Sequence, residues 1–341
     1  MAVSSLRIAA SLFSWLLLAA VFSAPFAAAS PTRTLAPRTS FSVSNVTGTI
    51  QVFDSSGNII LQGPATDGSG TNYDLPALIW IGFCLILGLP MAGAGIRGWR
   101  LTTGAGIGLA SAVCTWAAVI NSVNQTGIAD IFLTAIILVL FCCGFALGVF
   151  EIARLGGITA VGVAGGVAFG VRIVLLRAGL LISSTELYAL NWAIVGIFGI
   201  AGGLSLIWFQ RPALLFGCAS IGTFLTALGL DLIMAKQAGM SAGLRFLFDR
   251  NDNHAAFLLT NEYAAPIRTR ILIIASLALT PILAYIQHRI FRDPFTRRPA
   301  ESDDELAINF PTTGFEHKRS TFAPLWDGAK QKVDSINRFS V

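Results

Sequence analysis

One arginine lies inside a stretch that is otherwise long and apolar enough to cross a membrane. Arg172 directly follows the uncharged run 155–171. A charge within a bilayer usually faces other helices, pairs with a partner and marks a functional site. Asp231 ends a later apolar run and Asp130 begins an earlier one, so either carboxylate is a candidate partner. The sequence predicts an ion pair near the outer end of the membrane domain, serving either helix packing or a substrate or ion site.

Glycine spacing gives the second set of candidate residues. Three apolar runs carry glycines four residues apart, so the glycines of each run share one helix face. In a bilayer such faces let helices approach closely and pack by van der Waals contact. The residues are Gly144, Gly148, Gly162, Gly166, Gly170, Gly199 and Gly203. The pattern favours packing within one chain over a dimer interface.

No arrangement of residues typical of catalysis or metal binding occurs in the sequence. The three histidines, His254, His288 and His317, are far apart, and H-E-x-x-H, P-loop and nucleophile-elbow patterns are absent. The five cysteines all lie in apolar runs, which predicts small apolar core residues and no disulfide framework. The sequence therefore predicts a protein that is not an enzyme and that binds no cofactor and no metal.

The composition is that of a membrane protein. The chain has 341 residues, of which 54% are hydrophobic and only 12% are charged, whereas soluble domains carry about 25% charge. The formal net charge is +5. The basic residues are scattered or follow apolar runs, so they indicate topology and no nucleic-acid partner. The predicted partner is the lipid bilayer.

Seven uncharged runs must position the candidate residues. A helix needs roughly 20 residues to cross about 30 Å of hydrocarbon. The runs are 75–96, 101–129 (expected to end near 123), 131–150, 155–171, 187–210, 212–230 and 271–288. The sequence predicts an all-α membrane protein, with a seven-transmembrane helical bundle over residues 75–290.

Two segments precede this membrane domain. Residues 1–29 are predicted to be a signal peptide that is cleaved after Ala29, with an uncleaved anchor as the alternative. Residues 30–74 are predicted to be a luminal or extracellular segment that contains a short β-like region. Two strand-like runs, 49–53 and 59–61, flank a turn signal there and predict one small hairpin.

Flanking charge predicts the orientation of the bundle. Arginines gather at the helix ends that face the cytoplasm if the N-terminus is outside, and the loop between the second and third runs carries no lysine or arginine. The basic segment 235–270 opposes this rule, but short loops weigh most in it. We expect an integral protein of the secretory pathway or plasma membrane, with a luminal or extracellular N-terminus and a cytoplasmic C-terminus. Asn45 and Asn124 each begin a glycosylation acceptor on the luminal side; Asn124 lies close to the membrane, so Asn45 is the predicted glycosylation site.

The C-terminal segment differs from the rest of the chain. Residues 291–341 are polar and of mixed charge, which predicts a mostly disordered cytoplasmic tail. Within it, apolar residues recur at helical spacing and favour a short helix on the membrane surface as an alternative. They are Leu325, Trp326, Ala329, Val333 and Ile336. Such a tail is suited to binding unknown protein partners.

A family resemblance is carried by residues of the third and fourth runs. The stretch from Gly144 to Gly148, then Glu151 and the pair Gly156-Gly157, and the glycine-rich fourth run resemble the membrane domain shared by seven-transmembrane superfamily member 3 and transmembrane protein 198. The resemblance covers about residues 75–290. It implies a seven-helix membrane domain of poorly defined biochemical role and supplies no catalytic residues.

These observations favour a non-enzymatic multi-pass membrane protein that scaffolds or regulates partners. A transporter or channel is the alternative, although most of each run lacks acidic and basic residues. A seven-helix receptor fits less well. The third run ends at Glu151 and Arg154 without the acidic-Arg-aromatic motif, and the last run lacks Asn-Pro-x-x-Tyr around Pro281.

Overall fold

The computed structural model describes residues 42–46, 49–53, 56–95, 97–183, 187–261 and 263–291. Within them, seven helices are long and apolar enough to cross a membrane. They are α2 (Leu75–Ala94), α3 (Trp99–Ser122), α4 (Asp130–Val149), α5 (Arg154–Leu175), α6 (Ala189–Trp208), α7 (Gln210–Ala235) and α10 (Ile267–Ile290). The predicted seven-helix architecture is confirmed. The expected signal peptide and tail fall outside the described residues.

The helix ends follow local chemistry. Asp74 caps α2 by accepting the backbone N–H of Ala77 at 3.2 Å. Burial acts to raise the pKa of Asp74, but hydrogen bonds from Thr71 and Ala77 outweigh it and leave that pKa below its ordinary value. α3 ends at Ser122, close to the predicted position. α5 continues past Arg172 to Leu175, so the charge lies inside this helix.

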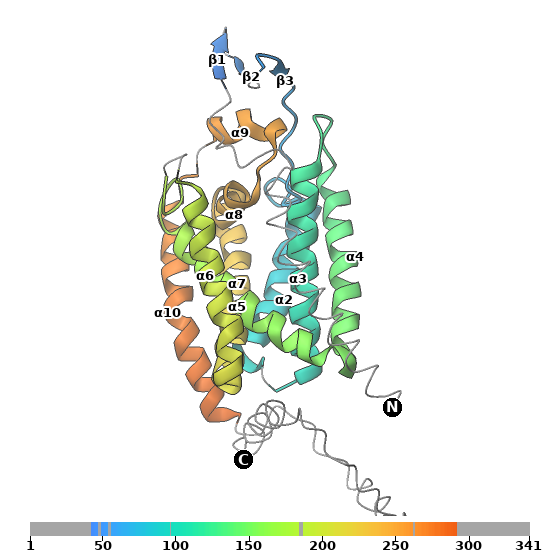
Figure 1. Cartoon of the computed structure of the whole chain (residues 1–341), viewed down its shortest axis with the longest axis vertical. Helices are drawn as coiled ribbons and strands as arrows, with labels where there is room; N and C mark the ends of the chain where they lie inside the picture. Colours follow the sequence, from blue (N-terminus) through green and yellow to red (C-terminus); the bar gives the residue numbers. More distant parts are fainter. Residues whose placement is uncertain are drawn as a thin grey trace, which may run out of the picture. The chain divides into compact units, whose positions relative to one another are not determined.

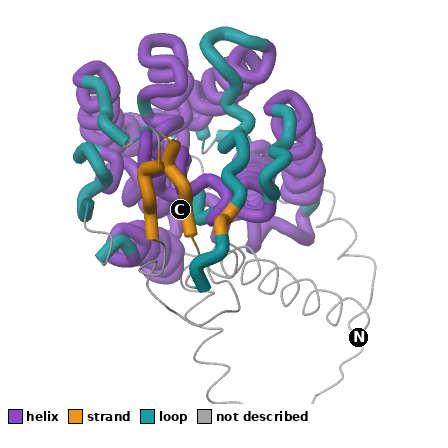
Figure 2. The backbone as a smooth tube through the Cα atoms, turned by 90° about the horizontal axis from the view of Figure 1, so that it is seen from above, coloured by secondary structure: helices purple, strands orange, loops and turns teal. Residues whose placement is uncertain are grey.

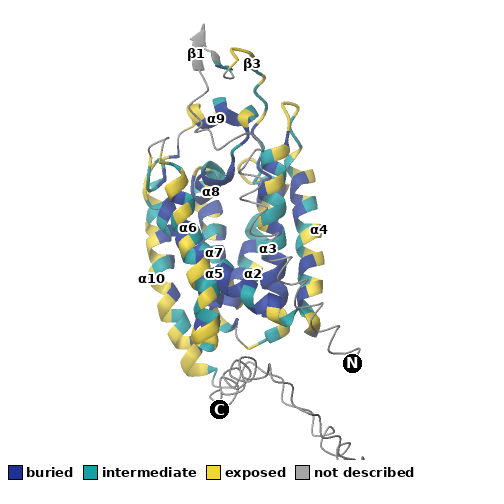
Figure 3. Cartoon of the chain, viewed as in Figure 1, coloured by how far each residue is buried: buried dark blue, intermediate teal, exposed yellow. Residues whose placement is uncertain are grey.

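α5 and α7 form the centre of the bundle. In each, 72% of the residues in the most apolar window are buried, against 17% in α6 and 22% in α10. α5 packs on α3, α6 and α7, while α7 also contacts α2 and α10, and α4 covers α3. Figure 1 shows the helices running side by side, and Figure 3 shows exposed residues on the outer sides of α4, α6 and α10. Residues on α5 and α7 are therefore the ones shielded from lipid.

A small antiparallel sheet marks one end of the bundle. Its strands are β1 (Ser42–Val46), β2 (Thr49–Phe53) and β3 (Ile59–Ile60), in the order β1-β2-β3. The predicted hairpin corresponds to β2 and β3, where Val52 pairs with Ile60, and β1 adds a strand that the sequence analysis missed. We call this the hairpin end; Figure 2 views the bundle from it. Asn45 lies in β1 and Asn124 in the α3–α4 turn, and glycosylation of Asn45 stays a prediction.

The basic segment 235–270 is folded into short helices, which the sequence did not predict. It contains η2 (Lys236–Ala238), α8 (Met240–Phe248), η3 (Asp252–His254) and α9 (Ala255–Thr260); a further short helix, η1 (Glu151–Ala153), precedes α5. α8 buries one face, on which Gly243 packs against Leu175 and Tyr263. α8 was not predicted from the sequence because so short a helix cannot span a membrane.

Candidate functional site

Arg172 is fully buried in the last turn of α5. Its Nε donates to the carbonyl oxygen of Ala168, one turn earlier, at 3.0 Å. The side chain thus points back along the helix, as long side chains in helices do. The guanidinium therefore lies nearer to the middle of the bundle than the Arg172 backbone does.

Four hydroxyl groups from two other helices surround the guanidinium. On α7, Oγ of Ser220 accepts from Nη2 at 2.7 Å and Oγ1 of Thr223 accepts from Nη1 at 2.9 Å. On α10, Oγ1 of Thr280 accepts from Nη1 at 3.0 Å, and Ser276 offers its carbonyl oxygen at 3.0 Å and its hydroxyl at 3.4 Å. All four side chains are buried. We call Arg172 and these four residues the arginine cluster.

The hydroxyl protons of the cluster are directed at backbone carbonyls. Each hydroxyl accepts a hydrogen bond from the guanidinium and donates its own proton to a peptide oxygen. The acceptors are the carbonyl oxygens of Gly165, Ala219, Ile273 and Ser276, at 2.6–2.8 Å. The guanidinium donors are thus satisfied by neutral oxygens, which leave its charge in place.

Asp231 is not the partner of Arg172. Its carboxylate accepts from Oγ1 of Thr269 at 2.6 Å and from the backbone N–H of Met240. Asp231 lies eight residues beyond Thr223 on α7, about 12 Å of helix toward the hairpin end. Because Arg172 points the other way, the ion pair predicted from the sequence is wrong.

Asp130 is not the partner either. It begins α4 at the hairpin end and accepts the backbone N–H of Gly68 at 2.9 Å. Ion pairs in the described part of the chain include those of Asp249 with Arg245 and with His254. Both candidate carboxylates thus hold segments at the hairpin end, and neither neutralises Arg172.

The buried side of α10 is polar. Of its five buried residues only Ile273 is apolar. The other four are Thr269, Ser276, Thr280 and Gln287, whose spacing of 7, 4 and 7 residues places them on one helix face. Large apolar residues cover the exposed face. α10 therefore turns its polar residues inward and its apolar residues to lipid.

Polar contacts extend from the buried side of α10 toward both ends of the bundle. Toward the hairpin end, Thr269 meets Asp231, and the hydroxyl of Tyr263 donates to the carbonyl of Leu175 at 3.0 Å. Burial raises the pKa of Tyr263 and the nearby Asp231 raises it further, so Tyr263 remains a donor. Toward the other end, the Gln287 amide donates to α2 carbonyls, at 2.6 Å for Ala92, while its Oε1 is buried without a partner. We call Asp231, Thr269, Gln287 and the arginine cluster the polar seam.

The seven predicted glycines all face a neighbouring helix. Gly144 and Gly148 of α4 lie against α3, where a Cβ on Gly148 would come within 2.6 Å of the carbonyl oxygen of Thr103. The other five lie where α5 and α6 meet. A Cβ on Gly166 would overlap the carbonyl oxygen of Phe198, and one on Gly170 would lie 3.0 Å from the Cα of Val195. These contacts are within the chain.

A glycine contact that the sequence analysis did not single out positions the arginine cluster. A Cβ on Gly165 of α5 would overlap the Cα of Gly217 on α7. The two backbones approach closely enough there for Oγ of Ser220 to reach the carbonyl oxygen of Gly165 at 2.6 Å. Small residues at the α5–α7 crossing therefore bring the hydroxyls of α7 to Arg172.

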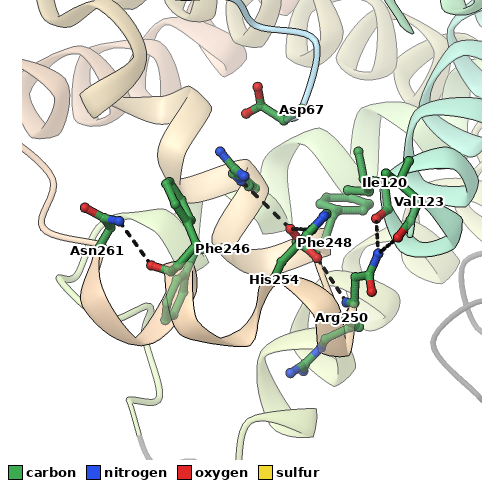
Figure 4. Close-up of polar contacts among 12 residues, drawn as sticks. Asp67, Ile120, Val123, Phe246, Phe248, Arg250, His254 and Asn261 are labelled. Carbon is green, nitrogen blue, oxygen red and sulfur yellow. Dashed lines mark hydrogen bonds and ion pairs between the residues drawn. The ribbon is translucent and has the colours of Figure 1, made fainter. Parts of the chain in front are cut away.

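A second polar network lies at the hairpin end (Figure 4). His254 contacts Asp249 through Nδ1 at 2.7 Å, and both side chains are buried. The Asn251 amide donates to the carbonyls of Ile120 and Val123, which joins the α8–α9 connection to the end of α3. Asp249 in this network has an arginine partner, Arg245, with Nε 3.8 Å from its Oδ2.

The described residues offer no cluster of three or more histidine, cysteine, aspartate or glutamate side chains of the kind that holds a metal ion. The five cysteines all lie in the described part of the chain, and no disulfide joins any two of them. Cys84 and Cys218 are buried as expected, but Cys142 and Cys143 face outward from α4. Their position is ordinary for a helix surrounded by lipid, where apolar side chains face outward.

The hydroxyl residues of the cluster carry no charge, so a charge pattern does not mark them within the membrane runs. A signal was available in the spacing of Ser276, Thr280 and Gln287 within the run 271–288, with Thr269 just before it. Serine and threonine are common in membrane helices, where they bond their own backbone. The spacing indicates a site only together with Arg172, which lies on α5, about one hundred residues earlier in the chain.

Comparison with known proteins identifies one relationship. The family model described as the TM7S3/TM198-like domain matches residues 81–288 of the chain. This stretch runs from α2 to α10 and contains the whole polar seam. No curated protein and no solved structure matches the chain.

Proposed function

The chain belongs to the TM7S3/TM198-like domain family, and from this premise we propose that it is a multi-pass membrane protein that moves a small polar solute across the bilayer along the polar seam. The family is that of a membrane domain and not of a known enzyme. The proposed activity requires no chemical step.

The polar seam is the observation that supports transport. Ionisable groups within a membrane are expensive to bury, and those that are retained commonly mark a path for a solute or ion; Arg172 and Asp231 are such groups in the seam. The seam extends along the buried face of α10 from Thr269 to Gln287, about 27 Å of helix. That length is close to the thickness of the hydrocarbon layer. The membrane runs have few charged residues, which counted against transport. In the polar seam, hydroxyl and amide groups supply the polarity instead.

Flux measurements test this proposal. Purified full-length protein in liposomes is expected to pass an isotopically labelled anion, cation or uncharged polyol faster than protein-free liposomes do. Replacing Gln287 by leucine should slow that flux several-fold, because it removes an amide from the seam. Thr159→Val is the matched control, since Thr159 is only half-buried on α5 and donates to the carbonyl oxygen of Leu155 in its own helix. Flux of none of the three solutes would contradict the proposal.

A second candidate function is the scaffolding of protein partners. It is favoured by the tail after Phe291, whose apolar residues at 325–336 recur at helical spacing. We propose that this tail is cytoplasmic, because helix ends opposite the hairpin end carry arginines. They are Arg97, Arg100, Arg154, Arg211 and Arg289.

Protease protection checks the orientation on which scaffolding depends. In sealed microsomes a C-terminal tag should be cleaved from outside, while a tag inserted before β1 stays protected until detergent is added. The full-length protein should then retain specific partners that a chain ending at Phe291 loses. A C-terminal tag that is protected in sealed microsomes would refute the cytoplasmic tail.

A further inference from the structure

We infer that the arginine cluster binds a small monovalent anion in the middle of the bundle. This inference names the solute class for the seam and so rests on the proposed transport function. Its starting point is the charge of Arg172, which is fully buried between α5, α7 and α10. An arginine side chain keeps its proton in proteins.

The charge of Arg172 has no counter-charge among the described side chains. Its hydrogen bonds end on hydroxyl and carbonyl oxygens. Such bonds satisfy N–H donors but do not cancel a net charge, and an unpaired charge in a medium of low dielectric is unfavourable. The ring of Phe169, with its centroid 5.5 Å from the guanidinium carbon, offsets only part of it. A bound anion would complete the balance.

The hydroxyls of the cluster give the anion its further ligands. Each hydroxyl carries one proton that rotates about the C–O bond, so it can turn from a carbonyl to an anion. Oγ1 of Thr223 and Oγ1 of Thr280 are 2.8 Å apart beside Nη1, and Oγ of Ser220 lies beside Nη2. An anion at this junction would accept hydroxyl protons together with guanidinium protons, which are strong charge-assisted bonds.

The same contacts limit the size and charge of the anion. A single guanidinium balances one negative charge, so a divalent anion would leave the site with excess charge. α5 and α7 approach to backbone contact at Gly165 and Gly217, which favours an ion of the size of chloride or nitrate over a bulky carboxylate such as gluconate.

The two ends of the seam differ in the charged residue that lies on the seam itself. At the hairpin end this residue is Asp231, a carboxylate, although the segment 235–270 around it is basic. The opposite end carries the five arginines of the α2–α3, α4–α5 and α6–α7 connections and of the α10 terminus, and such clusters raise the local concentration of anions. Gln287 lies between that end and the cluster; its amide protons donate to the carbonyls of Met91 and Ala92 and would have to turn from them to meet an incoming anion.

Anion-dependent thermal stability of the purified full chain tests the inference. At constant ionic strength, sodium chloride or nitrate should raise the unfolding temperature in a saturable way, relative to sodium gluconate. Thr280→Val should weaken the apparent affinity about tenfold by removing one hydroxyl ligand. Arg172→Gln should abolish the effect, and Thr159→Val should leave it unchanged.

Direct binding of radioactive chloride to the purified protein covers the case in which Arg172→Gln does not fold. Wild-type protein should bind chloride saturably, and nitrate should displace it while gluconate does not. Absence of saturable binding to the wild type overturns the inference, as does binding that Thr280→Val leaves unchanged. Flux of a cation or polyol without anion binding would support transport along the seam and contradict anion binding at the arginine cluster. Anion binding without flux would support the anion site at the arginine cluster and contradict transport along the seam.

Discussion

Replacing Thr223 and Thr280 together by valine is expected to destabilise the bundle by about 3 kcal/mol while Arg172 is present, and by only about 1 kcal/mol once Arg172 is methionine. The two hydroxyls accept hydrogen bonds from Nη1 of Arg172 at 2.9 and 3.0 Å. Their loss leaves guanidinium donors without acceptors at a fully buried position. The triple variant removes the charge as well as its acceptors, so no polar group is left without a partner.

The measurement is a double-mutant cycle on the free energy of unfolding in detergent, titrated with sodium dodecyl sulfate. Gluconate buffer keeps small anions from contributing to stability. Thr159→Val, combined with Arg172→Met, serves as the control cycle and should be additive, because this threonine is only half-buried and donates to the carbonyl oxygen of Leu155 in its own helix. A coupling near zero between Arg172 and the two threonines would show that the hydroxyls do not hold the arginine.

Adding one methyl group at Gly166 is expected to cost about 2 kcal/mol or more. A Cβ there would overlap the carbonyl oxygen of Phe198 on α6. The obstacle is backbone, which cannot move aside as the end of a flexible side chain does, so α5 and α6 must separate. Their separation loses van der Waals contact, which holds helices together in lipid in place of a hydrophobic drive.

Gly196→Ala on α6 is the matched control, because a Cβ at Gly196 would have no atom within 4 Å outside its own helix. It should be neutral or stabilising by up to about 1 kcal/mol, since alanine favours helix over glycine. Both variants are compared with the wild type by sodium dodecyl sulfate titration. Equal effects of the two substitutions would argue against close α5–α6 packing in the membrane.

The seven membrane helices could be predicted from the sequence because apolar runs of about twenty residues have few other places to lie. The observed bounds agree with the predicted runs within a few residues; α5, for example, begins at Arg154 and not at Leu155. α8 was missed because its nine residues are too few to span a bilayer, and β1 was missed because its alternation of polar and apolar residues breaks at Asn45. Local patterns detect an element only when its length or period is distinctive.

The glycine faces were partly predictable for a similar reason. A spacing of four residues places Gly162, Gly166 and Gly170 on one side of α5 whatever surrounds the helix. It does not say which helix lies against that side, and only the folded chain shows that it is α6. The neighbouring Gly165 faces α7 and drew no attention, because one glycine outside a repeat is an ordinary residue of a membrane helix.

The sequence by itself determined that Arg172 lies within a membrane span and that it needs a partner. Tertiary structure alone decided that its partners are hydroxyls of α7 and α10 and that it points away from Asp231. The helical period shows that Thr269, Ser276, Thr280 and Gln287 share a face, but not that this face is turned inward. In lipid the outer surface of a helix is apolar, so hydropathy cannot separate the inside of a bundle from its outside as it does in water. These residues form the polar seam only because packing brings together positions far apart in the sequence, such as Thr223 and Thr280.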